Sequence, residues 1–217
     1  MSLPPERMPR IPPDKMTEAQ KKAAAEIAAG PRGELRGPFI ALLRSPGLMN
    51  PVQKVGEYIR FNCPLDRRVM EFATLIAARF WTQQYEWQAH REHALKAGLD
   101  PAIADAIAEG RRPQGMKQDE EIVYELLTES LHNKSVSDAT YARAVAKFGE
   151  AGVVDLVGVT GYYLMLAMIM NLACTALPAA IAMRRSRSGG SAARAVVGSS
   201  AASSSRACAA SRSSLVA

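Results

Sequence analysis

The segment from Cys63 to Leu99 constrains the fold more than any other part of the chain, because its apolar residues recur with helical spacing. These residues, at i, i+3, i+4 and i+7, are Val69, Met70, Phe72, Ala73, Ile76, Ala77 and Phe80. Pro64 and Asp66 before them and Gly98 after them are typical of helix ends. The segment is long for one straight helix, so we expect two helices with a bend near Arg79–Thr82.

Helix signals recur along the chain, and no convincing strand pattern interrupts them. Thr17 and Gln20 have the spacing of a capping box, Asp100 precedes Pro101 as an N-cap, and Ser137 caps a further helix. The helices expected outside 63–99 cover 17–29, 39–44, 48–61, 100–110, 118–132 and 137–148. We therefore predict an all-α fold, a compact multi-helix domain.

Composition divides the chain into three parts. Residues 1–15 contain five prolines and no apolar run, so we expect a flexible arm and no secretory signal. Residues 16–180 form the predicted single helical domain. Residues 181–217 consist almost wholly of Ser, Ala, Arg, Gly and Val, and we expect a disordered low-complexity basic tail.

The formal net charge of +6 comes from the tail rather than from the body. Six arginines lie from Arg184 onward, and without them 21 basic and 21 acidic side chains remain. A groove that follows nucleic-acid phosphates needs clustered basic residues on the folded body, so we predict no nucleic-acid partner. The three cysteines are far apart and form no CxxC motif, which fits a reducing compartment and predicts a cytoplasmic protein.

The run Leu156–Met183 contains no charged residue and is long enough to span a membrane. The alternative is a central helix buried on all sides in a helical or oligomeric core. Gly158, Gly161 and Asn171 weaken the membrane interpretation, Pro178 cuts the run, and the preceding amphipathic helices need a surface to pack on. We favour the buried helix and predict no membrane partner.

The candidate chemistry lies on the second helix of the 63–99 segment. Gln83, Glu86 and His90 fall at i, i+3 and i+7, so their side chains share one face, and His93 follows. Glu71 on the preceding helix can be brought alongside by an antiparallel or bent pairing. A carboxylate beside an imidazole forms a proton-transfer pair, although the same spacing also occurs in ordinary Glu–His contacts on a solvated face.

Two other kinds of chemistry are less well supported by the residues. Glu86, His90 and His93 could ligate a metal ion from one helix, but no further ligand cluster accompanies them, so we predict no metal and no cofactor. Cys63 has no histidine close in sequence and Cys174 sits in an apolar run, where a thiol is usually inert.

The run RRVMEFATLIAARFWTQQYEWQAHREHALKAGL, with the later run IVYELLTESLHNKSVSDATYARAVAKFGEAGVVDLVGVTGYYLMLAMIMNLA, resembles the carboxymuconolactone decarboxylase family. That family also contains the alkylhydroperoxidase D-type proteins, and the resemblance covers roughly 39–178. It implies an all-helical domain of the alkylhydroperoxidase D-like type that assembles as a homo-oligomer, a trimer or a hexamer.

The peroxidase branch of that family carries a glutamate, then CxxC, then a histidine four residues after the second cysteine. By this spacing Glu71 matches the glutamate, Gln83 and Glu86 occupy the cysteine positions, and His90 matches the histidine. Thiol peroxidase chemistry needs one thiol to attack and another to resolve. The resemblance therefore implies a branch that lacks the CxxC cysteines, and an alkylhydroperoxidase-like antioxidant function is the least favoured alternative.

The decarboxylase branch implies a cofactor-free carboxy-lyase that protonates a small carboxylated lactone or ring compound, as in aromatic compound catabolism. The resemblance implies catalytic roles for Glu71, Glu86 and His90, with His90 as proton donor. We expect Gln83, Tyr85 and Arg79 to contact the small-molecule substrate, with Arg67, Arg68 and Arg91 as other candidates for its carboxylate. The alternatives are a non-catalytic small-molecule-binding or structural oligomer and a membrane-anchored helical protein.

Overall fold

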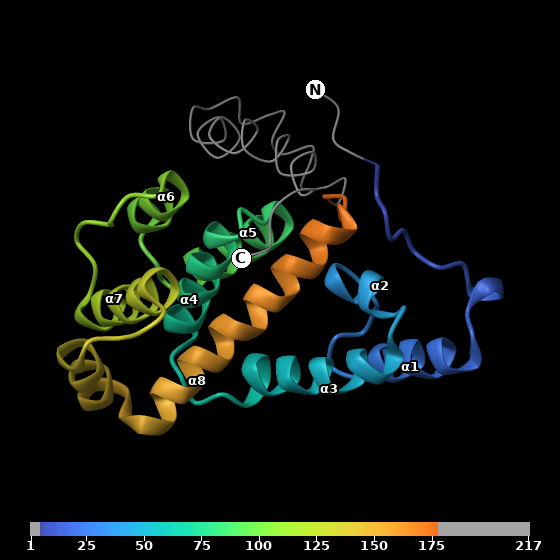
Figure 1. Cartoon of the computed structure of the whole chain (residues 1–217), viewed down its shortest axis with the longest axis horizontal. Coiled ribbons are helices and arrows are strands. Elements are labelled where there is room, and N and C mark those ends of the chain that lie inside the picture. The colour runs from blue at the N-terminus through green and yellow to red at the C-terminus, as the bar shows by residue number, and fades with distance from the viewer. Residues whose placement is uncertain (1–4, 178–217) are drawn as a thin grey trace, which may run out of the picture.

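The computed structural model describes residues 5–177 of the 217-residue chain. Every element in this range is helical, which confirms the predicted all-α fold (Figure 1). The elements are η1 (Pro13–Lys15), α1 (Glu18–Ala29), α2 (Pro38–Leu42), α3 (Pro46–Glu57), η2 (Tyr58–Asn62), α4 (Arg67–Phe80), α5 (Gln84–Lys96), α6 (Pro101–Glu109), α7 (Gln118–Asn133) and α8 (Asp138–Ala173). The predicted tail, 181–217, lies outside the described residues, as do residues 1–4.

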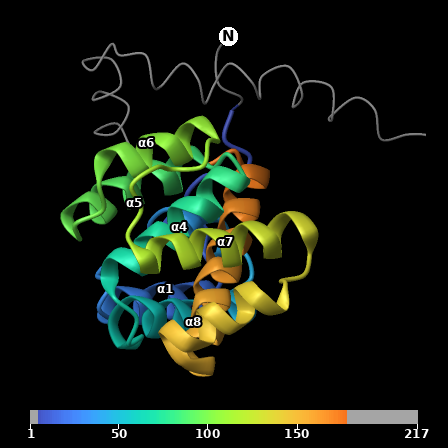
Figure 2. The same cartoon turned by 90° about the vertical axis from the view of Figure 1, so that its left-hand side faces the viewer.

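Helix α4 is the centre of the fold. Asp66 caps it by accepting hydrogen bonds from the backbone N–H groups of Arg68 and Val69. All residues from 69 to 78 are buried, because α4 packs against α5, α6, α7 and α8. Figure 2 shows α7 running across α4.

The predicted bend in the central segment is confirmed. Helix α4 ends at Phe80, Thr82 adopts a left-handed backbone with φ of 50°, and α5 begins at Gln84. The chain therefore reverses, and α5 packs back along α4. This pairing places side chains of the two helices face to face.

The helix predicted over 48–61 begins earlier, at Pro46, and ends in a different geometry. After Glu57 the chain continues as the π-helical turn η2, which carries Arg60. Single π-helical turns are rare and occur frequently at functional sites.

Helix α8 crosses the molecule between α1–α3 and α4–α7 (Figure 1). Gly149 interrupts it with non-helical angles, φ 70° and ψ 168°, at the place where we expected the helix ending near Phe148 to stop. The second half of α8 is the apolar run, and it ends at Ala173.

Within one copy of the chain this run is only partly buried, so its complete burial in a helical or oligomeric core stays a prediction. Tyr162, Tyr163 and Leu166 are buried, but the residues of another face are exposed: Val154, Val157, Met168 and Leu172. Helix α8 is long and apolar enough to cross a membrane by length and composition, and half of its most apolar window is buried inside the protein. A buried core helix passes the same test, so this finding is weak evidence for a membrane span.

The described part of the predicted arm runs along the folded body. The backbone N–H of Arg7 donates to the carbonyl of Ala173, and the Arg10 guanidinium donates to the carbonyl of Leu35. Arg44 donates to the carbonyl of Pro9. The flexibility predicted for residues 1–15 stays a prediction.

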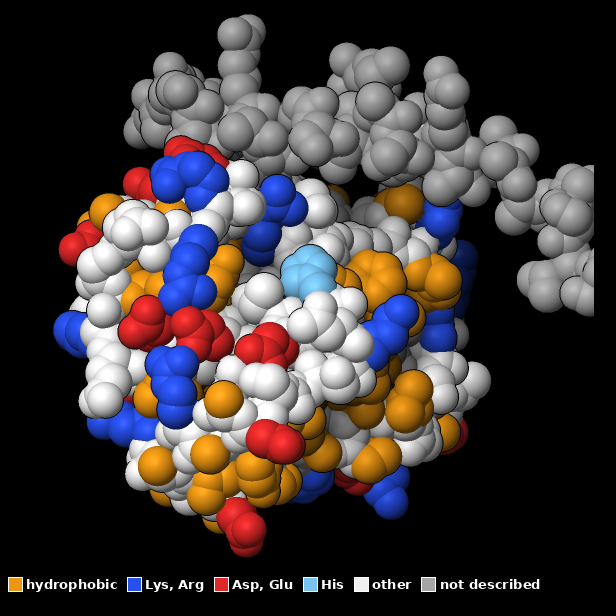
Figure 3. Space-filling view, turned by 60° about the vertical axis from the view of Figure 1, so that its left-hand side comes forward, with side chains coloured by type: hydrophobic (Ala, Val, Ile, Leu, Met, Phe, Trp, Pro, Cys, Tyr) orange, Lys and Arg blue, Asp and Glu red, His pale blue; other side chains and the backbone are white. Residues whose placement is uncertain are grey.

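Acidic and basic side chains are interspersed on the face shown in Figure 3, with apolar side chains between them. No patch of a single sign dominates that face.

Candidate functional site

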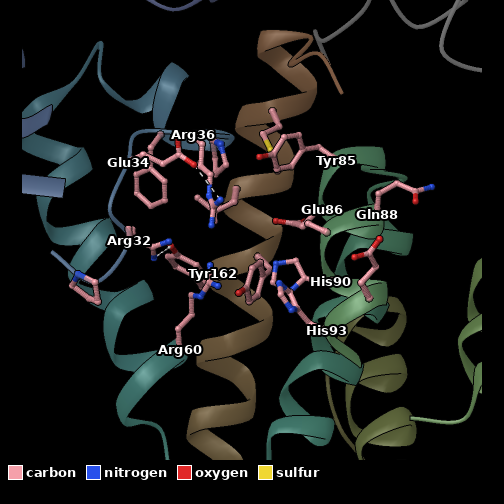
Figure 4. A pocket seen from close by; sticks show the side chains of 18 of the residues that line it. Arg32, Glu34, Arg36, Arg60, Tyr85, Glu86, Gln88, His90, His93 and Tyr162 are labelled. Atoms are coloured by element: carbon pink, nitrogen blue, oxygen red, sulfur yellow. Dashed lines mark hydrogen bonds and ion pairs between the residues drawn. The ribbon is translucent and has the colours of Figure 1, made fainter. Parts of the chain in front are cut away.

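A cavity of about 520 Å³ lies between α5, α8 and the N-terminal third of the chain (Figure 4). Helix α5 contributes Tyr85, Glu86, His90 and His93 to its wall. Helix α8 contributes Tyr162, Tyr163, Leu166 and Met170. Arg32, Arg36 and Arg60 line the side opposite α5. The cavity therefore combines titratable groups, arginines and apolar surface, as ligand sites usually do.

Glu71 and His90 meet because α5 packs against α4. His90 Nδ1 lies 2.7 Å from Glu71 Oε2, and both side chains are buried. Arg67, one turn before Glu71, places its Nη2 2.6 Å from the other carboxylate oxygen. His90 reaches the cavity wall, where its ring packs edge-on against Tyr163 at 4.6 Å between centroids.

The surroundings of Glu71 favour its ionised form. Burial alone would raise the pKa of this carboxyl, but the hydrogen bond from His90 and the charges of His90, Arg67 and His93 hold the pKa below its ordinary value. An ionised Glu71 accepts the Nδ1–H of His90 and leaves Nε2 as the ring nitrogen that can exchange a proton.

Glu86 is in the opposite situation. Its side chain is buried in the cavity wall, and neither carboxyl oxygen has a hydrogen-bond partner. Burial raises the pKa of this carboxyl well above its ordinary value. The two carboxyls therefore have pKa values shifted in opposite directions, lowered for Glu71 and raised for Glu86, an arrangement that suits acid–base chemistry.

His93 stands beside His90, with 6.0 Å between the ring centroids. Burial is the main cause that lowers its pKa, and the charges of His90, Arg60 and Arg67 add to the effect while Glu71 opposes it. Within residues 5–177 no group of three or more His, Cys, Asp and Glu side chains could hold a metal ion, so Glu86, His90 and His93 do not form such a site.

Gln83 is not among the residues that line this cavity and has a structural role, so its contact with substrate stays a prediction. Its Oε1 accepts hydrogen bonds from the backbone N–H groups of Tyr85 and Glu86, which caps α5. Its Nε2 donates to Asn171 on α8 at 3.0 Å. Tyr85 does line the cavity, as expected for a pocket residue.

The expected role of Arg79 is also not supported by its position. Arg79 Nε donates to the carbonyl of Ala108, and the side chain lines a separate cavity beside Phe80 and His132. The other candidate arginines are paired within the protein: Arg67 with Glu71, Arg68 with Asp119 and Glu120, and Arg91 with Asp105. In the folded protein these four arginines therefore bind neighbouring carboxylates or carbonyls and do not line this cavity.

No protein-family model matches the chain, and no curated protein matches it in sequence. A solved structure does match: the crystal structure titled alkylhydroperoxidase AhpD core, an uncharacterized peroxidase-related protein from Ralstonia eutropha JMP134. The TM-score is 0.65 at 12% sequence identity, and the match covers 83% of this chain and 96% of that chain. The chain has an AhpD-like fold.

Within this AhpD-like fold, the sequence could not identify the wall opposite His90. Arg32 lies in a Pro- and Gly-rich connection and Arg60 in the π-helical turn, and neither belongs to a recognisable motif. Tyr162 lies in the apolar run, for which the sequence predicted only a buried helix. The sequence offered one weak signal for this wall, a tyrosine with a polar hydroxyl in an otherwise apolar run.

Proposed function

We propose that this protein is a cofactor-free proton-transfer enzyme of the carboxy-lyase type, acting in the cytoplasm on a small carboxylated lactone or ring compound. The observation that carries the proposal is the buried Glu71–His90 hydrogen bond at the wall of a cavity. The AhpD-like fold fits the proposal, although the similarity at 12% identity extends to the fold alone.

The reaction would balance without an oxidant, a reductant or a metal ion. The bond between the substrate's carboxylate carbon and its ring breaks, and CO₂ leaves. The electron pair stays on the ring carbon and is delocalised into the lactone carbonyl as a dienolate. A proton from the enzyme then adds to carbon, and solvent restores it.

The two acids of the site suit the second step. His90, oriented by the ionised Glu71, would deliver the proton to carbon from Nε2. The neutral Glu86 would donate a hydrogen bond to the dienolate oxygen as negative charge develops there. Apolar residues of α8, such as Leu166 and Met170, exclude water and strengthen both interactions.

The test is decarboxylation of γ-carboxymuconolactone by the purified full-length protein, followed as CO₂ release. His90→Gln should lower turnover by about 10²–10⁴-fold, the usual contribution of a general acid, with an unchanged circular dichroism spectrum. His132→Gln is the matched control, because His132 lines the separate cavity. An equal rate in the His90→Gln variant and the wild type would overturn the proposal.

The non-catalytic alternative makes a different prediction. A family member that only binds a small molecule would show a ligand-induced rise in melting temperature without any release of CO₂. That outcome would replace the enzyme by a binding protein on the same fold.

A thiol peroxidase is less well supported by the site, although the matched structure is titled peroxidase-related. No cysteine is among the residues that line the cavity in the described part of the chain. Burial raises the pKa of the Cys63 thiol, which lowers its thiolate fraction. We expect no reduction of tert-butyl hydroperoxide by dithiothreitol above the uncatalysed rate.

A further inference from the structure

We propose that Arg32, Arg60 and Tyr162 form a binding subsite for a substrate carboxylate, on the side of the cavity opposite His90. The inference deepens the proposed function, on which it rests for the identity of the reaction, but the binding it predicts can be measured without turnover.

Arg32 and Arg60 are the first part of the argument. Both side chains are partly buried, both line the cavity, and the Nε–H of each is buried without a hydrogen-bond partner. The ion pairs among the described residues include neither of them. Buried donors without partners cost free energy, so two such arginines at one cavity indicate that an anion satisfies them.

Tyr162 contacts one of the two arginines directly. The Arg32 Nη2 donates to the Tyr162 hydroxyl at 3.2 Å. Burial is the largest effect on the pKa of this phenol and raises it, while the charges of Arg32 and Arg60 both act to lower it. Because the Tyr162 hydroxyl oxygen accepts from Arg32, its own O–H can serve as a third donor to an anion.

Gly56 on α3 shows that the fold leaves room for this cluster. A Cβ at position 56 would overlap both the Tyr162 hydroxyl and the Arg32 guanidinium. Any larger residue at position 56 would displace these two groups. The Arg32 guanidinium also lies over the aromatic ring of Phe39, 4.5 Å from its centroid.

The chemistry of the walls selects the class of ligand. Guanidinium groups bind a carboxylate through paired hydrogen bonds. Tyr163 and Leu166 of α8 also line the cavity, so the body of the ligand should be flat and apolar. The expected ligand is a carboxylate on an unsaturated ring.

Isothermal titration calorimetry of the full-length protein with benzoate and with benzamide tests the subsite directly. Benzoate should bind at least about 10-fold more tightly than its neutral analogue, the difference expected for one charge-assisted hydrogen bond. Its affinity should fall as salt is added. Equal affinities for benzoate and benzamide would overturn the proposal, and this comparison needs no variant.

Arg60→Gln and Arg32→Gln should each weaken benzoate binding about 10-fold or more, whereas Arg111→Gln should leave it unchanged. Arg111 pairs with Glu109 away from this cavity. Inorganic phosphate should bind more weakly than benzoate, and tighter binding of phosphate would overturn the assignment of a carboxylate. Unchanged benzoate affinity in the Arg60→Gln variant would overturn the subsite.

His90→Gln separates this proposal from the proposed function. That variant should lose turnover and still bind benzoate, because His90 lies on the opposite wall. Benzoate binding by a wild-type protein that releases no CO₂ would support the subsite and contradict the enzyme, whereas CO₂ release with no preference for benzoate would do the reverse.

Discussion

The pKa values of Glu71 and Glu86 are shifted in opposite directions because the surroundings of the two carboxyls differ. Glu71 accepts from His90 and pairs with Arg67, while both oxygens of Glu86 are buried without a partner. A pKa that changes on folding makes stability depend on pH, so replacing either glutamate should change the pH dependence of unfolding.

Glu86→Gln should change how stability varies with pH. As pH rises above about 4.3, the ordinary glutamate pKa, the unfolded chain loses a proton that the folded protein keeps on Glu86, because its folded pKa is raised. Wild-type stability should therefore fall, by up to about 1.4 kcal/mol per pH unit, until the folded pKa is reached. The variant has no such ionisation.

Urea unfolding between pH 4 and pH 7 measures this difference. The stability of Glu86→Gln relative to wild type should increase with pH across that range. Glu26→Gln, at an exposed position on α1, is the control and should run parallel to wild type. Parallel curves for Glu86→Gln as well would contradict a neutral Glu86.

Glu71→Gln should have the opposite pH signature. The variant removes the carboxylate from a buried pair and should cost about 2–3 kcal/mol at pH 7, less than a fully buried pair because Arg67 is partly exposed. The folded pKa of Glu71 is lowered, so its stabilisation is present above about pH 4.3 and is lost as pH falls through the folded pKa. The cost, measured by urea unfolding, should shrink at pH 3, and an unchanged cost would contradict this account.

At the scale of elements, the break in α8 depends on one backbone conformation. Gly149 has a φ of 70°, which other residues adopt only with strain. Gly149→Ala should destabilise the protein by about 1–2 kcal/mol. Gly47→Ala, in an open position of the first turn of α3, should stabilise it by about 0.5–1 kcal/mol.

Thermal unfolding checks both glycine variants. For a chain of this length 1 kcal/mol corresponds to about 2–4 °C in melting temperature. Gly149→Ala should melt below wild type and Gly47→Ala above it, and a Gly149→Ala variant as stable as wild type would contradict the role assigned to the break.

Helical spacing and capping residues predicted most helices well, because these signals lie close together in the sequence. The capping box of Thr17 and Gln20, the Asp100 cap and the bend before Gln84 all depend on neighbours within a few positions. The π-helical turn at Tyr58–Asn62 has no local signal of this kind, and the sequence did not predict it.

The candidate site was predictable on one wall only. Glu71 and His90 lie on two consecutive helices whose connection is short, so their meeting follows from the reversal of the chain. Arg32 and Tyr162 are 130 positions apart, and their contact depends on how α8 crosses the whole domain. For the same reason spacing alone could not show that Arg79 points to a different cavity.

For the whole molecule, the exposed apolar residues of α8 lead to a testable prediction about oligomerisation. Val154, Val157, Met168 and Leu172 form no part of the described core, and charged residues are absent from the run in which the last three lie. We expect a second copy of the chain to cover this face, in agreement with the homo-oligomer implied by the family resemblance.

Sedimentation velocity tests this expectation. Wild type should sediment as a trimer or a hexamer, and Val157→Lys should shift it toward the monomer. Val55→Lys, at a similarly exposed valine on α3, should have no effect. A monomeric wild type, or one that pellets with membranes after lysis, would contradict the assignment.

The hydrogen bonds of Gln83 limit how this site could change in evolution. One amide group caps α5 and, through Asn171, fastens that helix to the end of α8; Asn171 also donates to the carbonyl of Trp81. A cysteine at position 83 would introduce a thiol there but remove the side-chain cap of α5, the helix that carries His90. A thiol-based activity at this position would therefore require another residue to cap the first turn of α5.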